Sequence, residues 1–187
     1  MGKVYDRLDD ALAGFIGRQH VFFVGTAPDD PAGHLNVSPK GLDTFRILGP
    51  NTVAYLDLTG SGIETVAHLG DNGRITIMFC AFEGSPLIVR LYGRGRAVEP
   101  GDGEWDRLIA HFPKYPGARS VVVVDVERVA DSCGYAVPLY EHKGERSQLI
   151  AHAENKGPEG MERYKASKNK SSIDGIAGLR SAGGGGR

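Results

Sequence analysis

Residues 52–65 read TVAYLDLTGSGIET, and this stretch shows most clearly how the chain folds. β-branched and aromatic residues fill its first half, which predicts a strand at 52–58. The glycine-rich run 59–62 then predicts a tight turn, followed by a short helix. Ser61 and Glu64 have the spacing of a capping box, with Ser61 as the N-cap of that helix. The stretch therefore predicts a strand, a turn and a helix start in direct succession.

Further strands are predicted on both sides, because apolar segments alternate with glycine- and proline-rich turns. The expected strands lie at 20–26, 34–40, 44–48, 74–82, 87–98 and 120–130. The expected helices lie at 4–18, 62–69, 102–112, 146–155 and 158–168, and Trp105 is expected to pack against the sheet. About seven strands with few helices between them predict a mainly β (α+β) fold, an antiparallel barrel or sandwich.

One predicted strand is apolar on both faces. It contains four consecutive valines, Val121–Val124. A strand of this kind needs cover on both sides, so one face should lie under another element or against another chain. The second alternative would make the protein a dimer.

The size and charge of the chain exclude several classes of protein. Its 187 residues are typical of one compact domain. The 22 Lys and Arg residues nearly balance the 23 Asp and Glu residues, which gives no support for binding a nucleic-acid backbone. Neither a membrane-spanning run nor a signal peptide is recognisable. The only cysteines, Cys80 and Cys133, lie far apart, so we expect a cytoplasmic protein.

Two segments could bind an anion or a planar ligand. The turn at 59–62 places free N–H groups and the positive end of a helix dipole together, which suits a phosphate; the alternative is an ordinary capped helix. In 36–41, NVSPKG, Pro39 must lie at a sheet edge or a bulge. Backbone groups would then be free for a planar polar ligand, with Lys40 near its negative charge. The alternative is a strand that ends in a turn.

Three arginines on one predicted strand form a third candidate. Arg90, Arg94 and Arg96 share one parity, so they would face the same side and could form an anion-binding groove. The alternative is a solvated strand face, and a bulge at Gly93 or Gly95 would break the pattern.

Other chemistry has little support in the sequence. The six histidines show no metal-ligand spacing with one another or with the cysteines, so no metal site is expected. Cys133 has no base nearby in the sequence and is expected to be a buried structural residue rather than a nucleophile. No catalytic residue is assigned.

Three motifs in order, NVSPKG at 36–41, AYLDLTGSG at 54–62 and IVRLYGRGR at 88–96, resemble the FMN-binding split-barrel family related to pyridoxamine 5′-phosphate oxidase. Residues 131–138 and 172–175 resemble an uncharacterised branch of that family. The resemblance spans roughly residues 15–180. It implies a six-stranded antiparallel split β-barrel with peripheral helices, usually a homodimer with FMN at the dimer interface.

The resemblance also implies a set of cofactor-binding residues. They are Asn36, Val37, Ser38, Pro39, Lys40, Leu58, Thr59, Ser61, Gly62, Thr65 and Arg90. Two features of the family's oxidases are absent. An Arg-Lys pair that follows their turn serine is replaced here by Gly62 and Ile63, and their C-terminal W-x-x-x-R-L-x-P stretch has no counterpart. The chain is therefore not expected to oxidise pyridoxamine phosphate.

These observations predict an FMN-binding oxidoreductase that passes hydride through flavin N5 to an unidentified small molecule. The alternatives are a deazaflavin-dependent reductase, a flavin-storage or sensor protein without turnover, and a structural dimer with an empty cleft. We expect a flavin-binding barrel domain at 1–140, a helical extension at 141–180 that packs on the barrel or on a partner, and a disordered Gly-rich tail at 181–187.

Overall fold

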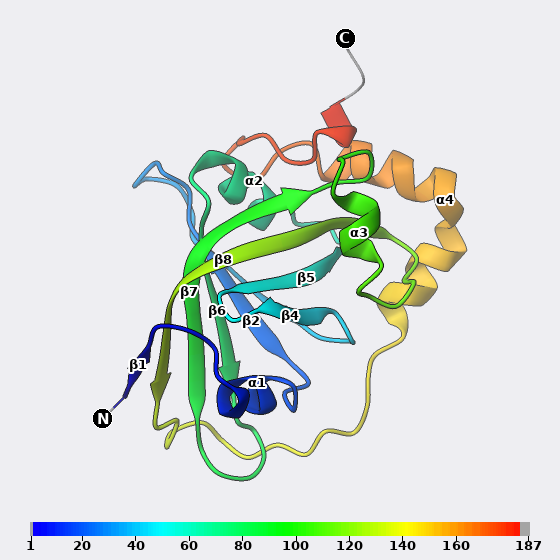
Figure 1. Cartoon of the computed structure of the whole chain (residues 1–187). Helices are drawn as coiled ribbons and strands as arrows, with labels where there is room; N and C mark the ends of the chain where they lie inside the picture. Colours follow the sequence, from blue (N-terminus) through cyan, green and yellow to red (C-terminus); the bar gives the residue numbers. More distant parts are fainter. Residues whose placement is uncertain (1, 184–187) are drawn as a thin grey trace.

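The computed structural model describes residues 2–183 and confirms a mainly antiparallel β fold with peripheral helices (Figure 1). The strand order is β3-β2-β6-β7-β8-β5-β4, and β1 pairs with β8. The strands are β1 Val4–Tyr5, β2 Phe22–Thr26, β3 Asn36–Lys40, β4 Phe45–Gly49, β5 Thr52–Leu58, β6 Arg74–Cys80, β7 Ile88–Val98 and β8 Ala118–Ser132. The helices are α1 Asp10–Ile16, α2 Glu64–Asp71, α3 Trp105–Ile109, α4 Gln148–Lys168 and the 3₁₀ turn η1 Ser181–Gly183.

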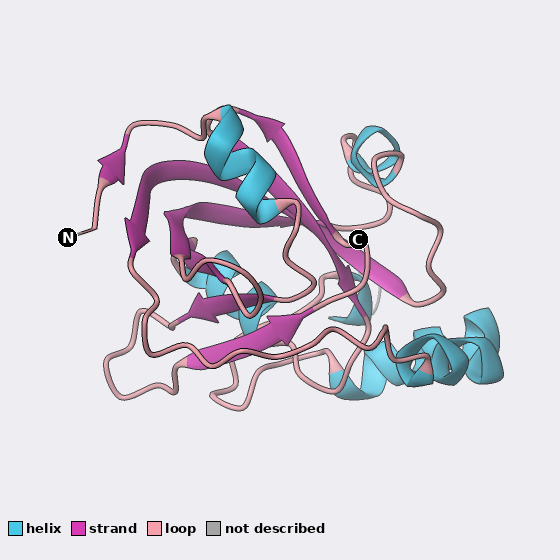
Figure 2. Cartoon of the chain, turned by 90° about the horizontal axis from the view of Figure 1, so that it is seen from below, coloured by secondary structure: helices cyan, strands magenta, loops and turns pink. Residues whose placement is uncertain are grey.

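All seven strands expected from the sequence are present. The short β1 brings the count to eight, where the family resemblance implied six. The two longest strands, β7 and β8, pair along their lengths and join the two halves of the sheet. Figure 2 shows the strands curving round into a barrel, with the helices on its outside. Within residues 2–183 no helix has the length and apolarity needed to cross a membrane.

The chain itself covers both faces of the four-valine strand. Val122 and Val124 belong to the main core inside the barrel, whereas Val121 and Val123 pack in a second cluster with Leu108 of α3. Trp105, as expected, packs against this second cluster. Burying one such valine stabilises the fold by about 1.5–3 kcal/mol, so this cover is energetically substantial. The valine run therefore requires no second chain.

Side chains alternate between the two faces along the whole of β7, although a bulge was expected at its glycines. The register shifts between Tyr92 and Gly93, and the extra residue, Glu127, lies in the partner strand β8. Gly93 is needed because a Cβ there would collide with the backbone of Asp125. The three arginines of β7 thus keep one parity and do share a face.

The first helix is shorter than expected. It begins at Asp10, because the Asp9 side chain accepts a hydrogen bond from the Leu12 N–H at 2.8 Å and caps it. Val4 and Tyr5 instead extend along the edge of β8. The apolar pattern that suggested one long helix thus combines a strand with a true helix, and Leu12 on its inner face is buried.

The C-terminal region also differs in detail from expectation. The two expected helices form one element, α4, which is interrupted at Gly157, whose φ of 64° is outside the helical range. The helix expected at 102–112 is shorter and spans Trp105–Ile109. Of the expected disordered tail, Ser181–Gly183 forms η1, where Ala182 packs against Ile63; residues 184–187 lie outside the described part. Cys133, expected to be buried, is exposed.

Candidate functional site

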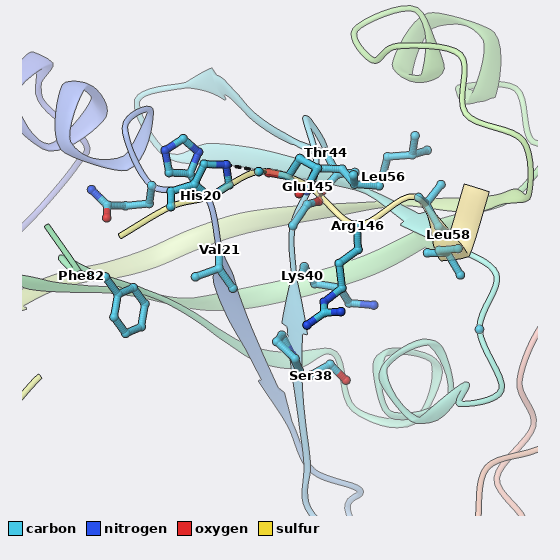
Figure 3. Close-up of a pocket in the computed structure, with 18 of the residues that line it drawn as sticks. His20, Val21, Ser38, Lys40, Thr44, Leu56, Leu58, Phe82, Glu145 and Arg146 are labelled. Atoms are coloured by element: carbon cyan, nitrogen blue, oxygen red, sulfur yellow. Dashed lines mark hydrogen bonds and ion pairs between the residues drawn. The ribbon is translucent and has the colours of Figure 1, made fainter. Parts of the chain in front are cut away.

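A large pocket opens on one side of the barrel and encloses about 1230 Å³ (Figure 3). Its wall includes the edge strand β3, the turn between β5 and α2, and residues 133–147, which we call the strap, together with residues 18–21 and 82–84. The strap runs from the end of β8 to α4 (Figure 1). A pocket of this size accommodates a ligand as large as a nucleotide cofactor.

The floor of the pocket contains a buried charge cluster. Asp57 of β5 is completely buried and accepts hydrogen bonds from Lys40 Nζ at 2.8 Å and from Arg119 Nε at 2.7 Å. Burial alone would raise the pKa of Asp57, but the two cations outweigh burial and lower it to about 2. The carboxylate is therefore ionised, and two cations with one anion leave a net positive charge below the pocket.

This cluster extends to the turn that was expected to hold an anion. The Gly60 carbonyl accepts hydrogen bonds from Asn169 Nδ2 at 3.0 Å and from Arg119 at 3.4 Å, and Arg119 also donates to Asn169 Oδ1 at 3.0 Å. Asn169 follows α4 directly, so a C-terminal residue fixes the turn. Sequence reasoning missed Asp57, Arg119 and Asn169; the only local signal is a charged residue inside or beside an apolar strand.

The start of α2 differs from the expected capping box. Ile63 is the N-cap, and no side chain forms a capping hydrogen bond, so Ser61 lies ahead of the helix rather than capping it. Ser61 and Gly62 are exposed on the pocket wall. The first N–H groups of α2 therefore lack a side-chain acceptor, which leaves the positive end of the helix available to an anion.

The edge strand β3 and α2 are tied together by side chains. Asn36 Nδ2 donates to the Thr65 hydroxyl at 3.1 Å and to the Ser38 hydroxyl at 3.2 Å. Pro39 lies, as predicted, in a strand at the edge of the sheet, because β3 pairs only with β2. One side of β3 is therefore free of backbone pairing beside the pocket.

The pocket gathers most of the expected cofactor-binding residues. The wall includes Ser38, Pro39, Lys40, Leu58, Ser61, Gly62 and Thr65. Thr59 is buried and its hydroxyl donates to the Gly117 carbonyl, whereas Val37 is exposed on the side of β3 opposite to Ser38. Asn36 contacts the wall residues Ser38 and Thr65.

Arg90 is not among the residues of the pocket wall, and its side chain donates to the Ser132 hydroxyl at 3.0 Å. The other two arginines of β7 also have partners. Arg94 pairs with Glu127 and Arg96 pairs with Glu104. Arg94 and Arg96 are thus paired with acidic residues and Arg90 with a hydroxyl, so the three do not form an open anion groove.

Charged side chains of both signs line the pocket. Lys40 and Arg119 adjoin the turn, and Figure 3 shows Lys40 and Arg146 reaching into the pocket. Acidic residues Glu83, Glu141 and Glu145 belong to the strap and the loop beneath it. Basic and acidic side chains thus lie at both ends of the pocket, since Glu64 of α2 adjoins the turn and Arg146 belongs to the strap.

An antiparallel split barrel with a charged pocket beside an edge strand defines the class of protein. Residues 8–133 match the family model described as pyridoxamine 5′-phosphate oxidase. The chain is 36% identical to the pyridoxamine 5′-phosphate oxidase family protein ustO of Aspergillus flavus, over 95% of this chain and 78% of that protein. The chain belongs to the pyridoxamine 5′-phosphate oxidase family.

Solved structures show the same fold at low identity. A HupZ variant from group A Streptococcus has a TM-score of 0.52 and 23% identity, covering 66% of this chain and 98% of that one. A candidate pyridoxamine 5′-phosphate oxidase from Lactobacillus delbrueckii has a TM-score of 0.51 and 20% identity, covering 67% and 94%. These similarities confirm the split-barrel fold.

Proposed function

We propose that this chain binds a flavin, FMN, in the pocket and acts as an oxidoreductase on a small molecule. The observation that carries the proposal is a pocket of cofactor size in which an uncapped helix start and several cations meet. Membership of the family supports it. A bound flavin would supply the redox chemistry by hydride transfer at N5, and the chain's own residues would bind and orient it.

The residues present fit the phosphate of FMN in a particular way. The N–H groups at the start of α2, the Ser61 hydroxyl and the Arg146 side chain would hold it. Ile63 cannot contribute, because it is buried in a small cluster with Leu179. The groups that would bind the phosphate thus differ from the Arg-Lys pair of the family's oxidases. The unpaired side of β3 would face the polar edge of the ring, and a role for Arg90 stays a prediction.

A titration that compares FMN with riboflavin tests the proposal, because the two ligands differ only in the phosphate. We expect FMN to quench its fluorescence on binding at micromolar concentrations and to bind roughly tenfold or more tightly than riboflavin. Arg146→Met should reduce this preference. The matched control is Arg94→Met, which removes an arginine outside the pocket. A protein that binds neither ligand, or an equal loss in both variants, would contradict the proposal.

The replacement of the Arg-Lys pair by Gly62 and Ile63 keeps a deazaflavin as the second candidate cofactor. The same titration with a deazaflavin cofactor decides between them by affinity. Turnover is read separately: loss of flavin absorbance with NADH or NADPH supports an oxidoreductase. A bound flavin that neither donor reduces would instead favour the storage or sensor alternative.

We also propose that the protein works as a homodimer. The support is the exposed apolar side chains of Leu35 and Val37, which lie beside and on β3, Val37 on the side opposite to Ser38. Sedimentation equilibrium should give twice the chain mass of 20.0 kDa, and Val37→Lys should weaken association. A wild-type protein that sediments as a monomer at high concentration would contradict the dimer.

A further inference from the structure

The strap end of the pocket holds three metal-ligating side chains that sequence spacing did not reveal. His20, His142 and Glu145 each offer one ligand atom, and these atoms all lie within 4.8 Å of one another. His20 precedes β2, whereas the other two belong to the strap. The expectation of no metal site considered only spacing along the chain, and the fold brings together residues that are far apart in it.

The ligand atoms of the cluster lie close together, but the side chains are not yet arranged as in a coordination site. The two imidazole rings stack with centroids 3.7 Å apart and an angle of 11° between them. His142 Nε2 lies 3.8 Å from Glu145 Oε1, which is too long for a direct hydrogen bond. Ligand atoms around a tetrahedral Zn²⁺ lie roughly 3.3 Å apart. Because the lone pair of an imidazole nitrogen lies in the plane of its ring, the two stacked rings must separate and turn before both can bind one ion.

The backbone around the cluster supports the carboxylate. Glu145 Oε2 accepts a hydrogen bond from the Leu42 N–H at 3.3 Å, while Oε1 faces His142. Leu42 has a φ of 60°, and within residues 2–183 no other non-glycine residue has a positive φ. Such a conformation is uncommon for a residue with a side chain and is often found at functional sites. In known metal sites, a hydrogen bond such as the one from the Leu42 N–H to Glu145 orients the ligating side chain.

The strap is also anchored beside its ligands. The backbone N–H of His142 donates a hydrogen bond to Glu83 Oε1 at 2.8 Å. The Tyr140 ring stacks on the Phe82 ring, with centroids 5.5 Å apart. These contacts hold His142 over the pocket, so that the strap needs little ordering to bind an ion. Pre-ordering of this kind lowers the entropic cost of binding.

We propose that His20, His142 and Glu145 bind one divalent transition-metal ion. Two imidazoles and one carboxylate suit Zn²⁺ and its first-row neighbours. All three residues line the pocket, so a bound ion would lie at its wall. The ion would fasten the strap to the barrel and present an open position to an oxygen or nitrogen atom of the pocket's occupant.

A Zn²⁺ titration of the flavin-free protein against a chromophoric chelator tests this inference. We expect one equivalent of Zn²⁺ to bind, and His20→Ala, His142→Ala and Glu145→Gln each to weaken binding roughly tenfold or more. His111→Ala removes an exposed histidine outside the cluster and should leave binding unchanged. The Co²⁺ absorption spectrum of the wild type reports the ligand geometry independently.

The inference is overturned if wild type binds Zn²⁺ no more tightly than the triple variant, or if His111→Ala weakens binding equally. Glu145→Gln keeps the size of the side chain, so it decides the matter even if a histidine variant folds poorly. Because the titration contains no flavin, its failure leaves the cofactor proposal unaffected. Failure of the FMN titration, in turn, leaves the metal site unaffected.

Discussion

The buried charge cluster makes a strong prediction about Asp57→Asn. The substitution keeps the shape of the side chain but removes the negative charge that Lys40 and Arg119 share. Two cations would then lie at the floor of the pocket without a counter-charge. Arg119 would also hold Asn169 and the Gly60 carbonyl less firmly, because its Nε–H would lose an ionised acceptor.

The magnitude follows from the pKa and the burial of Asp57. Its pKa falls from 3.8 to about 2, which corresponds to about 2 kcal/mol of stabilisation at neutral pH. Breaking a buried pair by removing one partner typically costs about 3–5 kcal/mol, since the other charge stays buried. We therefore expect a loss of about 3 kcal/mol and a decrease in Tm of roughly 6–12 °C.

The effect should depend on pH with a definite sign. The folded pKa of Asp57 lies below the unfolded value, so its stabilisation is complete above the unfolded value and is lost as pH falls through the folded value. The stability difference between wild type and Asp57→Asn should thus shrink from about pH 5 towards about pH 2.

Urea denaturation followed by circular dichroism, near neutral pH and at about pH 3, measures both effects. Asp125→Asn is the matched control, since Asp125 lies exposed on β8, and it should change stability by less than about 0.5 kcal/mol. The reasoning is refuted if the two variants lose the same stability. A difference that stays constant down to about pH 3 would also refute it.

Two further predictions concern the packing of the barrel and its response to acid. Gly93→Ala should cost more than about 3 kcal/mol or prevent folding, because its Cβ would collide with the Asp125 backbone. A Cβ added at Gly49 meets no atom, so Gly49→Ala should melt near the wild-type Tm. Similar losses of stability in Gly93→Ala and Gly49→Ala would contradict the expected collision. Burial lowers the pKa of His68, so wild-type stability should decrease as pH falls below about 6.5. Thermal melts of His68→Gln should show a weaker decrease, and an unchanged slope would exclude His68 as the cause.

Local patterns in the sequence predict the strands, the edge position of Pro39 and two segments of the pocket wall, 36–41 and 59–62. These features follow from local rules: side-chain alternation, turn residues and the missing N–H of proline. The same local rules misjudged the first helix, because Val4 and Tyr5 pair with β8, a strand more than a hundred residues away in sequence. They also misjudged Ser61, because Ile63 becomes the N-cap of α2 once Leu179 packs on it.

Which charged and polar residues meet depends on how remote segments pack together. Asp57, Arg119 and Asn169 lie on β5, on β8 and after α4, and they come together only once the strands have their register and the C-terminal segment packs on the barrel. His20 and His142 stack for the same reason, because the strap returns over the pocket. Such contacts depend on distances between segments that are remote in the chain, and no pattern within one segment encodes those distances.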